Sequence, residues 1–463
     1  MTRIAPARVL ALNPCDTVDG DYVLYWMQQS QRVATNHALE YAVDLANDLN
    51  RPLIVGFGLM DDYPEANLRH HVFLLEGLQE TQQALEERGI AFVLRPGPPP
   101  QVALDLAQRA CAVVCDRGYL RHQRAWRREV ATSAKCRVVQ VESDVIVPVE
   151  AASQKSEYAA RTLRPRIQRL LAEHLVELEP ATLKHPAQGL KLPVSLDLHN
   201  PESLARSLKL DMSVEPVTRF FRGGTGAAEK LFHTFLADRL KTYGKHRNQP
   251  QTNDVSHMSK YLHFGQISPT WLALEARKHT DAAGDDVATF IEELLVRREL
   301  SMNFTHFRDD YDRYDGLPGW ARQTLAAHRQ DPRTNLYSPA QLEAAETHDP
   351  YWNAAMKEMR HTGYMHNYMR MYWGKKILEW SPTPEEAFAT ALAINNKYFL
   401  DGRDANSFAN IAWVFGQHDR PWGERPIFGK VRYMNARGLE RKCDIQAYVA
   451  KVERLSGGLV KAW

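Results

Sequence analysis

The residues best suited to chemistry gather between positions 351 and 413, where tryptophans alternate with charged and amide side chains. They are Trp352, Trp373, Trp380, Trp413, Asn395, Asp401, Arg403 and Asp404. A packed core requires hydrophobic side chains, but it does not require this many indoles beside arginine, histidine and asparagine. Tryptophan is bulky, easily oxidised and stacks well on other rings. The stretch is therefore suited to holding an aromatic cofactor, or to passing electrons to one.

Two segments upstream offer groups that could bind an anion. Gly223, Gly224 and Gly226 precede a helical stretch, so their amides could face an anion, although a flexible helix entry explains these glycines more simply. Ser256 and Ser259 lie close to an expected helix start, where hydroxyls and amides suit a pyrophosphate. Serine is also an ordinary helix cap, so neither segment establishes a binding site by itself.

Positive charge is concentrated near the end of the chain. Over 463 residues, 58 Lys and Arg balance 56 Asp and Glu, so net charge says nothing about nucleic acid. Residues 416–442 hold only three acids, Asp419, Glu424 and Glu440, against Arg420, Arg425, Lys430, Arg432, Arg437, Arg441 and Lys442. Such a run is usually a solvated surface. With aromatic residues inside it, it also suits contacts with phosphates and bases.

The cysteines and the apolar runs exclude several classes of protein. Five cysteines are irregularly spaced, and Cys111 and Cys115 have no second Cys/His pair nearby to complete a zinc site. Their apolar neighbours favour a buried strand, so we predict no metal. The N-terminus has no signal-peptide core, and no apolar run reaches the roughly 20 residues that span a bilayer. We expect a cytoplasmic protein that does not enter a membrane.

Two kinds of structure must position these groups. Up to residue 150, continuous apolar runs alternate with amphipathic helical stretches, which predicts an α/β domain (1–150) on a doubly wound, Rossmann-like parallel sheet. No GxGxxG follows the first strand, so the usual dinucleotide fingerprint is absent. Prolines interrupt residues 151–215, which we interpret as an interdomain linker along the surface. Helical periodicity predicts a larger all-α domain over 216–463.

Four separated segments resemble the photolyase/cryptochrome family. Residues 256–269, SHMSKYLHFGQISP, are similar to its flavin-binding segment, and residues 363–371, GYMHNYMRM, to a second one. Residues 25–39, YWMQQSQRVATNHAL, and 400–404, LDGRD, resemble class II cyclobutane pyrimidine dimer (CPD) photolyases in particular. The resemblance covers nearly the whole chain. It implies a deoxyribodipyrimidine photo-lyase whose all-α domain binds FAD and uses its reduced anionic form.

In that family the excited flavin passes an electron to a dimer flipped out of DNA, the cyclobutane ring opens, and the electron returns. The resemblance implies a cofactor site formed by Tyr243, Ser256, His257, Met258, Ser259, Arg298, Arg370, Asp401 and Asp404. Arg370 and Asp401 are expected to form an ion pair near the flavin ring, where positive charge favours the reduced anion. Asn395 matches an asparagine near flavin N5, although an ordinary turn asparagine is the alternative.

The resemblance also assigns the groups that act on the substrate. Glu293 is expected to hydrogen-bond the base edge of the dimer, a solvated helix carboxylate being the alternative. Trp373 and Trp352 match the class II pair that reduces resting flavin, while Trp380 is either an accessory or part of the core. UV-damaged DNA containing pyrimidine dimers is the implied partner of a monomer, through Met371, Trp413, Arg420, Trp422 and Arg432.

Departures from the family pattern and competing functions leave some points open. Tyr368 stands where many class I relatives carry arginine, and Arg297 stands where some relatives have a stacking tryptophan. By analogy, the N-terminal domain would host an antenna chromophore, a deazaflavin or a folate. The alternatives are a (6-4) photolyase or a cryptochrome-like blue-light sensor, a non-enzymatic DNA-binding module, and a nucleotide-hydrolysing enzyme. The last lacks a P-loop.

Overall fold

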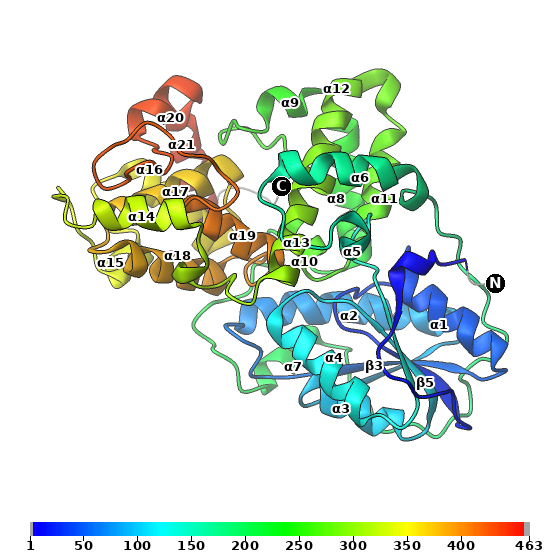
Figure 1. Cartoon of the computed structure of the whole chain (residues 1–463). Coiled ribbons are helices and arrows are strands. Elements are labelled where there is room, and N and C mark those ends of the chain that lie inside the picture. The colour runs from blue at the N-terminus through cyan, green and yellow to red at the C-terminus, as the bar shows by residue number, and fades with distance from the viewer. Residues whose placement is uncertain (1–2, 458–463) are drawn as a thin grey trace.

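The computed structural model describes residues 3–457 and begins with a six-stranded sheet (Figure 1). In the order β1-β6-β5-β2-β3-β4, its strands are β1 (Val9–Ala11), β6 (Arg137–Val141), β5 (Ala110–Asp116), β2 (Tyr22–Trp26), β3 (Leu53–Leu59) and β4 (Ala91–Pro96). Neighbours from β6 to β4 are parallel. Only β1 is antiparallel, to β6, and it is a short, largely exposed edge strand, a common addition to parallel sheets.

Helices cover both faces of this sheet, as the doubly wound α/β prediction requires. On one face, α1 (His37–Asp48) and α2 (Leu68–Glu87) pack with Val23 and Val55. On the other, α3 (Pro99–Ala107) and α4 (Arg121–Ser133) pack with Leu24 and Ile54. The predicted α/β architecture is therefore confirmed. All five cysteines are free, and Cys111 and Cys115 lie on the fully buried β5, as their apolar neighbours indicated.

Residues 151–215 contain more regular structure than their prolines suggested. After α5 (Val149–Ala152) comes α6 (Ala160–His174), and α7 (Pro201–Ser207) lies near the end of the segment. Leu163 and Ile167 of α6 are buried in the same cluster as Phe232 and Leu295 from the helical part. The rest of the segment runs irregularly along the α/β part, where Leu196 donates a backbone hydrogen bond to Leu94.

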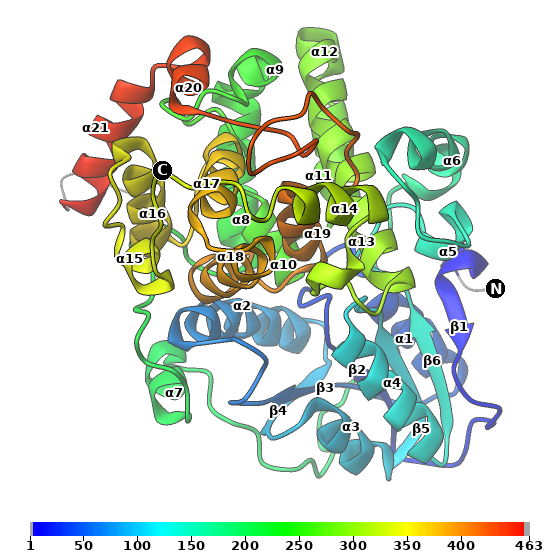
Figure 2. The same ribbon diagram turned by 60° about the vertical axis from the view of Figure 1, so that its left-hand side comes forward.

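From residue 216 onward the described chain is helical (Figure 2). Its α-helices are α8 (Thr225–Asp238), α9 (Tyr243–His246), α10 (Ser259–His263), α11 (Pro269–Arg277), α12 (Thr280–Ile291), α13 (Arg298–Phe307), α14 (Gly319–Ala327), α15 (Pro339–Ala344), α16 (Pro350–Thr362), α17 (Asn367–Trp380), α18 (Pro384–Tyr398), α19 (Ala405–Val414), α20 (Ala436–Lys442) and α21 (Ile445–Ser456). A π-helix, η3 (Glu292–Arg297), joins α12 to α13. Short 3-10 turns are η1 (Pro6–Arg8), η2 (Leu240–Thr242) and η4 (Tyr314–Gly316).

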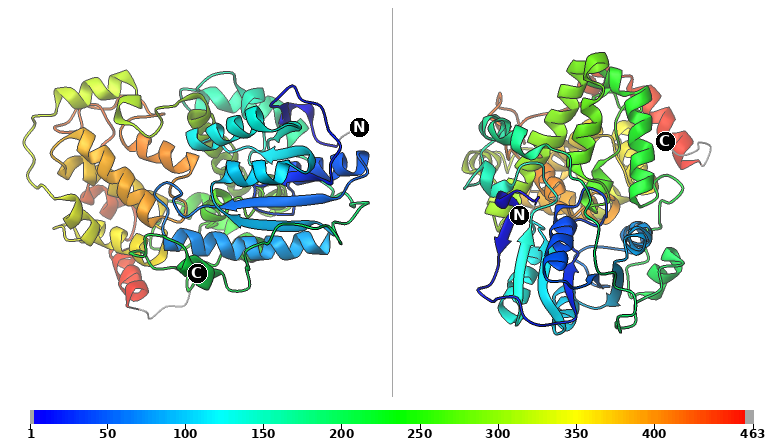
Figure 3. Two further views of the ribbon diagram at one scale, coloured as in Figure 1. Left: turned by 90° about the horizontal axis from the view of Figure 1, so that it is seen from below. Right: turned by 90° about the vertical axis from the view of Figure 1, so that its right-hand side faces the viewer.

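Buried arginines join the two parts, which lie side by side in Figure 3. Arg69 of α2 donates to the carbonyls of Met359 (3.3 Å) and Tyr398 (2.7 Å), at the ends of α16 and α18. The Met359 carbonyl also accepts from the Gly363 N–H that caps α16, whereas the Tyr398 carbonyl lies at the end of α18, where carbonyls lack a partner within the helix, so Arg69 provides its donor. None of the helices among residues 3–457 combines the length and apolarity needed to cross a membrane.

Candidate functional site

Three separated sequence segments meet at one buried cluster of charged and hydroxyl groups. Arg370 of α17 forms an ion pair with Asp401 (Nη2 to Oδ1, 2.6 Å). The Ser259 hydroxyl, at the start of α10, hydrogen-bonds the same carboxylate. The ion pair expected from the sequence is therefore present, and it is attached directly to the segment 256–259.

The neighbours of Asp401 in this cluster favour its ionised form. Burial opposes ionisation of Asp401, but Arg370, the Ser259 hydroxyl and Lys260 outweigh it and keep the pKa of Asp401 below its ordinary value. Lys260 is itself buried, and burial lowers its pKa to about 7. Its Nζ donates to the carbonyl of His257 (2.9 Å), a residue held at φ 58°. The loop before α10, including the buried Met258, is thus fixed in an unusual conformation next to the ion pair.

Asn395 of α18 has a buried side-chain amide whose nitrogen is hydrogen-bonded and whose oxygen is not. Its Nδ2 donates to Ser407 Oγ (2.7 Å) and Asn396 Oδ1 (2.9 Å). Among the described residues, its Oδ1 has no hydrogen-bond partner although it is buried. A buried acceptor without a partner costs roughly 1–3 kcal/mol, so this oxygen is an acceptor that a bound group could satisfy. The amide fits a ring N–H of a bound cofactor, as the resemblance to flavoproteins implies.

A path of aromatic rings leads away from the ion pair. The guanidinium carbon of Arg370 lies 3.5 Å from the centroid of the Phe399 ring, and Phe399 is 6.4 Å from Trp373. Trp352 donates its indole N–H to the Trp373 carbonyl (3.0 Å) and lies 5.7 Å from Trp380 between centroids. All three tryptophans are buried. The structure therefore brings Trp373 and Trp352 together, as the family resemblance implied, with Trp380 beside them.

Glu293 lies in the π-helix η3, and its partner is a residue that the sequence did not suggest. Arg247, just after α9, pairs with the Glu293 carboxylate (Nη2 to Oε1, 2.8 Å). The neighbouring Glu292 instead binds Arg164 of α6 (2.7 Å). π-Helices are rare in proteins overall, and those that do occur often lie at functional sites. Glu293 is one-third exposed, so it is available to a ligand, and the buried Tyr243 lies beneath Arg247.

Arg298 and Asp404 face the α/β part of the protein. Arg298 donates to the Asp144 carboxylate (2.9 Å) and to the Asp144 carbonyl (2.7 Å), and both residues are buried. Burial raises the pKa of Asp144 to about 7, against the influence of Arg298 and Arg32. Asp404 comes within 3.8 Å of His263 Nδ1. The guanidinium of Arg298 is thus already paired at the domain junction, a role that the sequence did not indicate.

Four of the residues expected to contact DNA form a cluster where the last turn of α19 meets the loop 417–433. Trp413, in the last turn of α19, is half-buried and has the Arg432 guanidinium 5.7 Å from its ring centroid. The same guanidinium lies 4.8 Å from Trp422, which has Arg420 at 4.9 Å. Met371 is also half-buried, next to Arg370 on α17. Trp413, Arg432, Trp422 and Arg420 are therefore brought together from a helix and a loop, whereas Met371 lies beside the ion pair.

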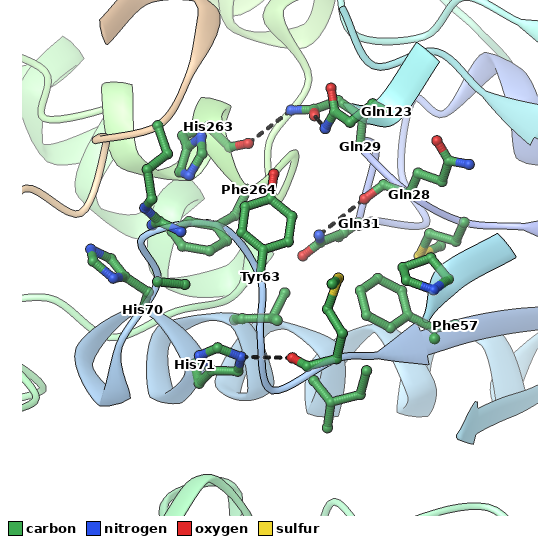
Figure 4. Close-up of a pocket in the computed structure, with 18 of the residues that line it drawn as sticks. Gln28, Gln29, Gln31, Phe57, Tyr63, His70, His71, Gln123, His263 and Phe264 are labelled. Atoms are coloured by element: carbon green, nitrogen blue, oxygen red, sulfur yellow. Dashed lines mark hydrogen bonds between the residues drawn. The ribbon is translucent and has the colours of Figure 1, made fainter. Parts of the chain in front are cut away.

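A pocket opens at the carboxyl ends of β2 and β3, between the sheet and the helical part (Figure 4). Its lining combines amides and imidazoles with rings, including Gln29, Phe57, His70, Trp126 and Phe264. Gln29 bridges the two parts by donating to the His263 carbonyl (2.8 Å). Arg403, a buried residue at φ 63°, also lines the pocket, and its Nε and Nη2 have no hydrogen-bond partner among the described residues. The guanidinium lies 5.9 Å from the centroid of the Tyr63 ring, and Glu65 and Asp404 partly balance its charge, so it has N–H groups to spare for a ligand but not an uncompensated charge.

Comparisons with known proteins agree with this geometry. A family model described as DNA photolyase matches residues 23–187. A curated deoxyribodipyrimidine photo-lyase from Methanothermobacter thermautotrophicus is 52% identical over 439 residues, 94% of this chain and 95% of that protein. The chain belongs to the photolyase/cryptochrome family. The family resemblance drawn from the four sequence segments is confirmed, and the relative's name supports the prediction of a deoxyribodipyrimidine photo-lyase.

Solved structures of more distant members share the fold. A bacterial class III photolyase from Agrobacterium tumefaciens has a TM-score of 0.73 at 19% identity and covers 94% of this chain and 87% of its own. An archaeal photolyase from Sulfolobus tokodaii, described with two FAD molecules, has a TM-score of 0.68 at 13% identity and covers 94% of this chain and 92% of its own. At these identities the likeness concerns the fold, an α/β domain followed by a helical one.

Proposed function

We propose that this protein repairs cyclobutane pyrimidine dimers in DNA with light, using reduced FAD. The observation that carries the proposal is the buried cluster in which Ser259, Asp401 and Arg370 lie together at one end of the tryptophan path. When bound, reduced and light-excited FAD supplies the electron that opens the cyclobutane ring. Membership of the photolyase family and the 52% identity to a deoxyribodipyrimidine photo-lyase support this assignment.

The residues around the cluster fit FAD by chemical type. Tyr243 and the segment Ser256, His257, Met258 and Ser259 would hold its phosphates and ribityl chain. Arg370 would stabilise negative charge on the reduced ring because its guanidinium is nearly buried, and a cation in low dielectric favours a nearby anion. The unpaired Oδ1 of Asn395 would accept a ring N–H. Asn395 and Arg370 match class II photolyases, so we assign the chain to that class.

The catalytic groups divide by role. Glu293 would hydrogen-bond the base edge of the dimer once Arg247 turns toward the DNA backbone, because the two side chains are paired in this structure. Trp373 and Trp352 would pass electrons toward the resting cofactor, and their contact through one hydrogen bond between buried residues keeps the path dry. Met371, Trp413, Arg420, Trp422 and Arg432 would hold the damaged strand.

We also propose that the N-terminal pocket holds the antenna chromophore, a deazaflavin or a folate. The pocket is lined by rings that suit a flat conjugated ligand, and the Arg403 Nε and Nη2, which have no hydrogen-bond partner among the described residues, suit an acceptor group on it. Replacing Arg403 with leucine should lower the yield of bound antenna while FAD content stays unchanged. Equal antenna content in the variant would remove Arg403 from this role.

The test of the whole proposal is a visible spectrum of the purified protein, followed by blue light with dimer-containing DNA under reducing conditions. A flavin spectrum with light-dependent loss of dimers is expected. Flavin without repair would favour the (6-4) photolyase or the blue-light sensor, and a colourless protein that still binds DNA would favour a binding module. The same preparation, run on a sizing column, tests the proposed monomer. Fractionation of cells tests the proposed cytoplasmic location.

A further inference from the structure

One buried cation in the helical part has no role in the site described so far. Lys375, on α17 two residues beyond Trp373, has a relative exposure of 0%. Lysine is almost never fully buried unless it is paired with an acid, and burial lowers the pKa of Lys375 to about 7. An apolar residue of similar length would fill the same space without this cost, so the ammonium requires an explanation.

The ammonium is directed at the end of α19. It donates a hydrogen bond to the carbonyl of Val414, the last residue of that helix, and lies 5.3 Å from the centroid of the Trp413 ring. Helix α17 reaches α19 closely because residue 374 is glycine, where a Cβ would come within 2.7 Å of the Val414 side chain. Lys375 therefore touches Trp413 from inside the protein, while part of the indole remains exposed.

From Trp413, cations and indoles alternate outward into the loop 417–433. The order is Lys375, Trp413, Arg432, Trp422 and Arg420, with cation-to-ring distances of 5.3, 5.7, 4.8 and 4.9 Å. Asp419 fixes the outer end, because its carboxylate accepts from the Trp422 indole N–H at 3.2 Å. Of the two ends of this series of cations and indoles, the buried end is the one held between two helices, α17 and α19. Lys375 therefore sets the position from which Trp413, Arg432, Trp422 and Arg420 extend.

We propose that Lys375 is a positioning residue that orients the Trp413 indole for stacking on the flipped dimer. This inference rests on the proposed function, in which Trp413 contacts the substrate. Lys375 touches neither substrate nor cofactor. In its protonated form it holds one face of the indole through a desolvated cation–π contact, and in either form its hydrogen bond to Val414 fixes the backbone beside that indole.

The experiment compares FAD-loaded wild type with Lys375→Met and Lys375→Gln. Each is titrated with a duplex containing one thymine dimer and with the same duplex undamaged. We expect dimer affinity to fall roughly 5- to 30-fold in both variants, the range for loss of one desolvated cation–π contact, with undamaged-duplex affinity changed less than about twofold. Because glutamine keeps an N–H donor close to the Val414 carbonyl while it removes the charge, full dimer affinity in Lys375→Gln would show that Lys375 only caps α19, and would overturn the proposal.

Lys376→Met is the matched control. Its ammonium lies on the other side of α17, 5.5 Å from Trp380 and paired with Glu379, so dimer affinity should stay at the wild-type value. A loss equal to that of Lys375→Met would overturn the proposal in favour of a general effect on α17. Melting temperature and the rate of flavin photoreduction, measured on every variant, separate misfolding from misorientation. An affinity loss that scales with a lowered melting temperature also counts against the proposal.

Trp413→Ala distinguishes failure of this inference from failure of the proposed function. If Trp413 stacks on the dimer, Trp413→Ala weakens dimer binding, and the double variant with Lys375→Met is then no weaker than Trp413→Ala alone. Additive losses would show that Lys375 acts through another group and would refute the inference only. Unchanged dimer binding in Trp413→Ala would refute the substrate contact itself.

Discussion

Replacing Asp401 with asparagine tests whether the ion pair at the site is as strongly coupled as its burial indicates. The Arg370 and Asp401 side chains are only 11% and 13% exposed, and their atoms are 2.6 Å apart. Removing one partner from a buried pair leaves a charge uncompensated, which costs about 3–5 kcal/mol. In Asp401→Asn both Arg370 and the buried Lys260 lose their counter-charge. We therefore expect a loss of at least about 3 kcal/mol in the free energy of unfolding.

The double variant Arg370→Met with Asp401→Asn should recover a large part of that loss. It removes the stranded guanidinium, and Lys260 can shed its proton because its pKa is already lowered to about 7. Unfolding of wild type, Asp401→Asn, Arg370→Met and the double variant in guanidinium chloride gives the coupling energy. The exposed pair of Arg329 and Glu385, with both side chains 44% exposed, is the control, and Glu385→Gln should cost less than about 1 kcal/mol.

The sign of the pH dependence follows from the lowered pKa of Asp401. The unfolded carboxyl titrates near pH 3.9 and the folded one below it, so the pair stabilises the folded protein above about pH 4. That contribution is lost as the pH falls through the folded pKa, and the stability gap between wild type and Asp401→Asn should narrow there. A loss below about 1 kcal/mol at neutral pH, or a double variant no more stable than Asp401→Asn, would refute the reasoning.

Three further predictions concern function. Trp373→Phe should leave light-driven repair by pre-reduced enzyme largely intact and block photoreduction of oxidised flavin, and normal photoreduction would remove its role in electron transfer. Glu293→Ala should lower the repair yield with FAD still bound, whereas an unchanged yield would refute a contact with the base edge. Arg432→Ala should weaken DNA binding and reduce the slope of log affinity against log salt by about one, since it removes one phosphate contact. An unchanged slope would show that Arg432 does not touch phosphate.

The sequence predicted those residues of the candidate site that lie inside short, recognisable motifs. Ser259 and the pair of Arg370 and Asp401 were found because they lie inside recognisable segments, and the structure joins them. Arg247 was missed because nothing in its neighbourhood marks it as the partner of Glu293, 46 positions away in the sequence. Arg298 was assigned to the cofactor, yet its guanidinium binds Asp144, since a sequence does not say which domain a helix face meets.

The sequence by itself determined the family, the alternation of buried strands and helices, and the groups for which we propose roles in anion binding or electron transfer. These depend on local periodicity and on residue type. Tertiary structure alone decided that α6 would join the helical core despite its proline, and that Lys375 would be buried under Trp413. Both outcomes depend on which surfaces meet. The free energy of burial and of pairing belongs to contacts between distant residues, and no local pattern records those contacts.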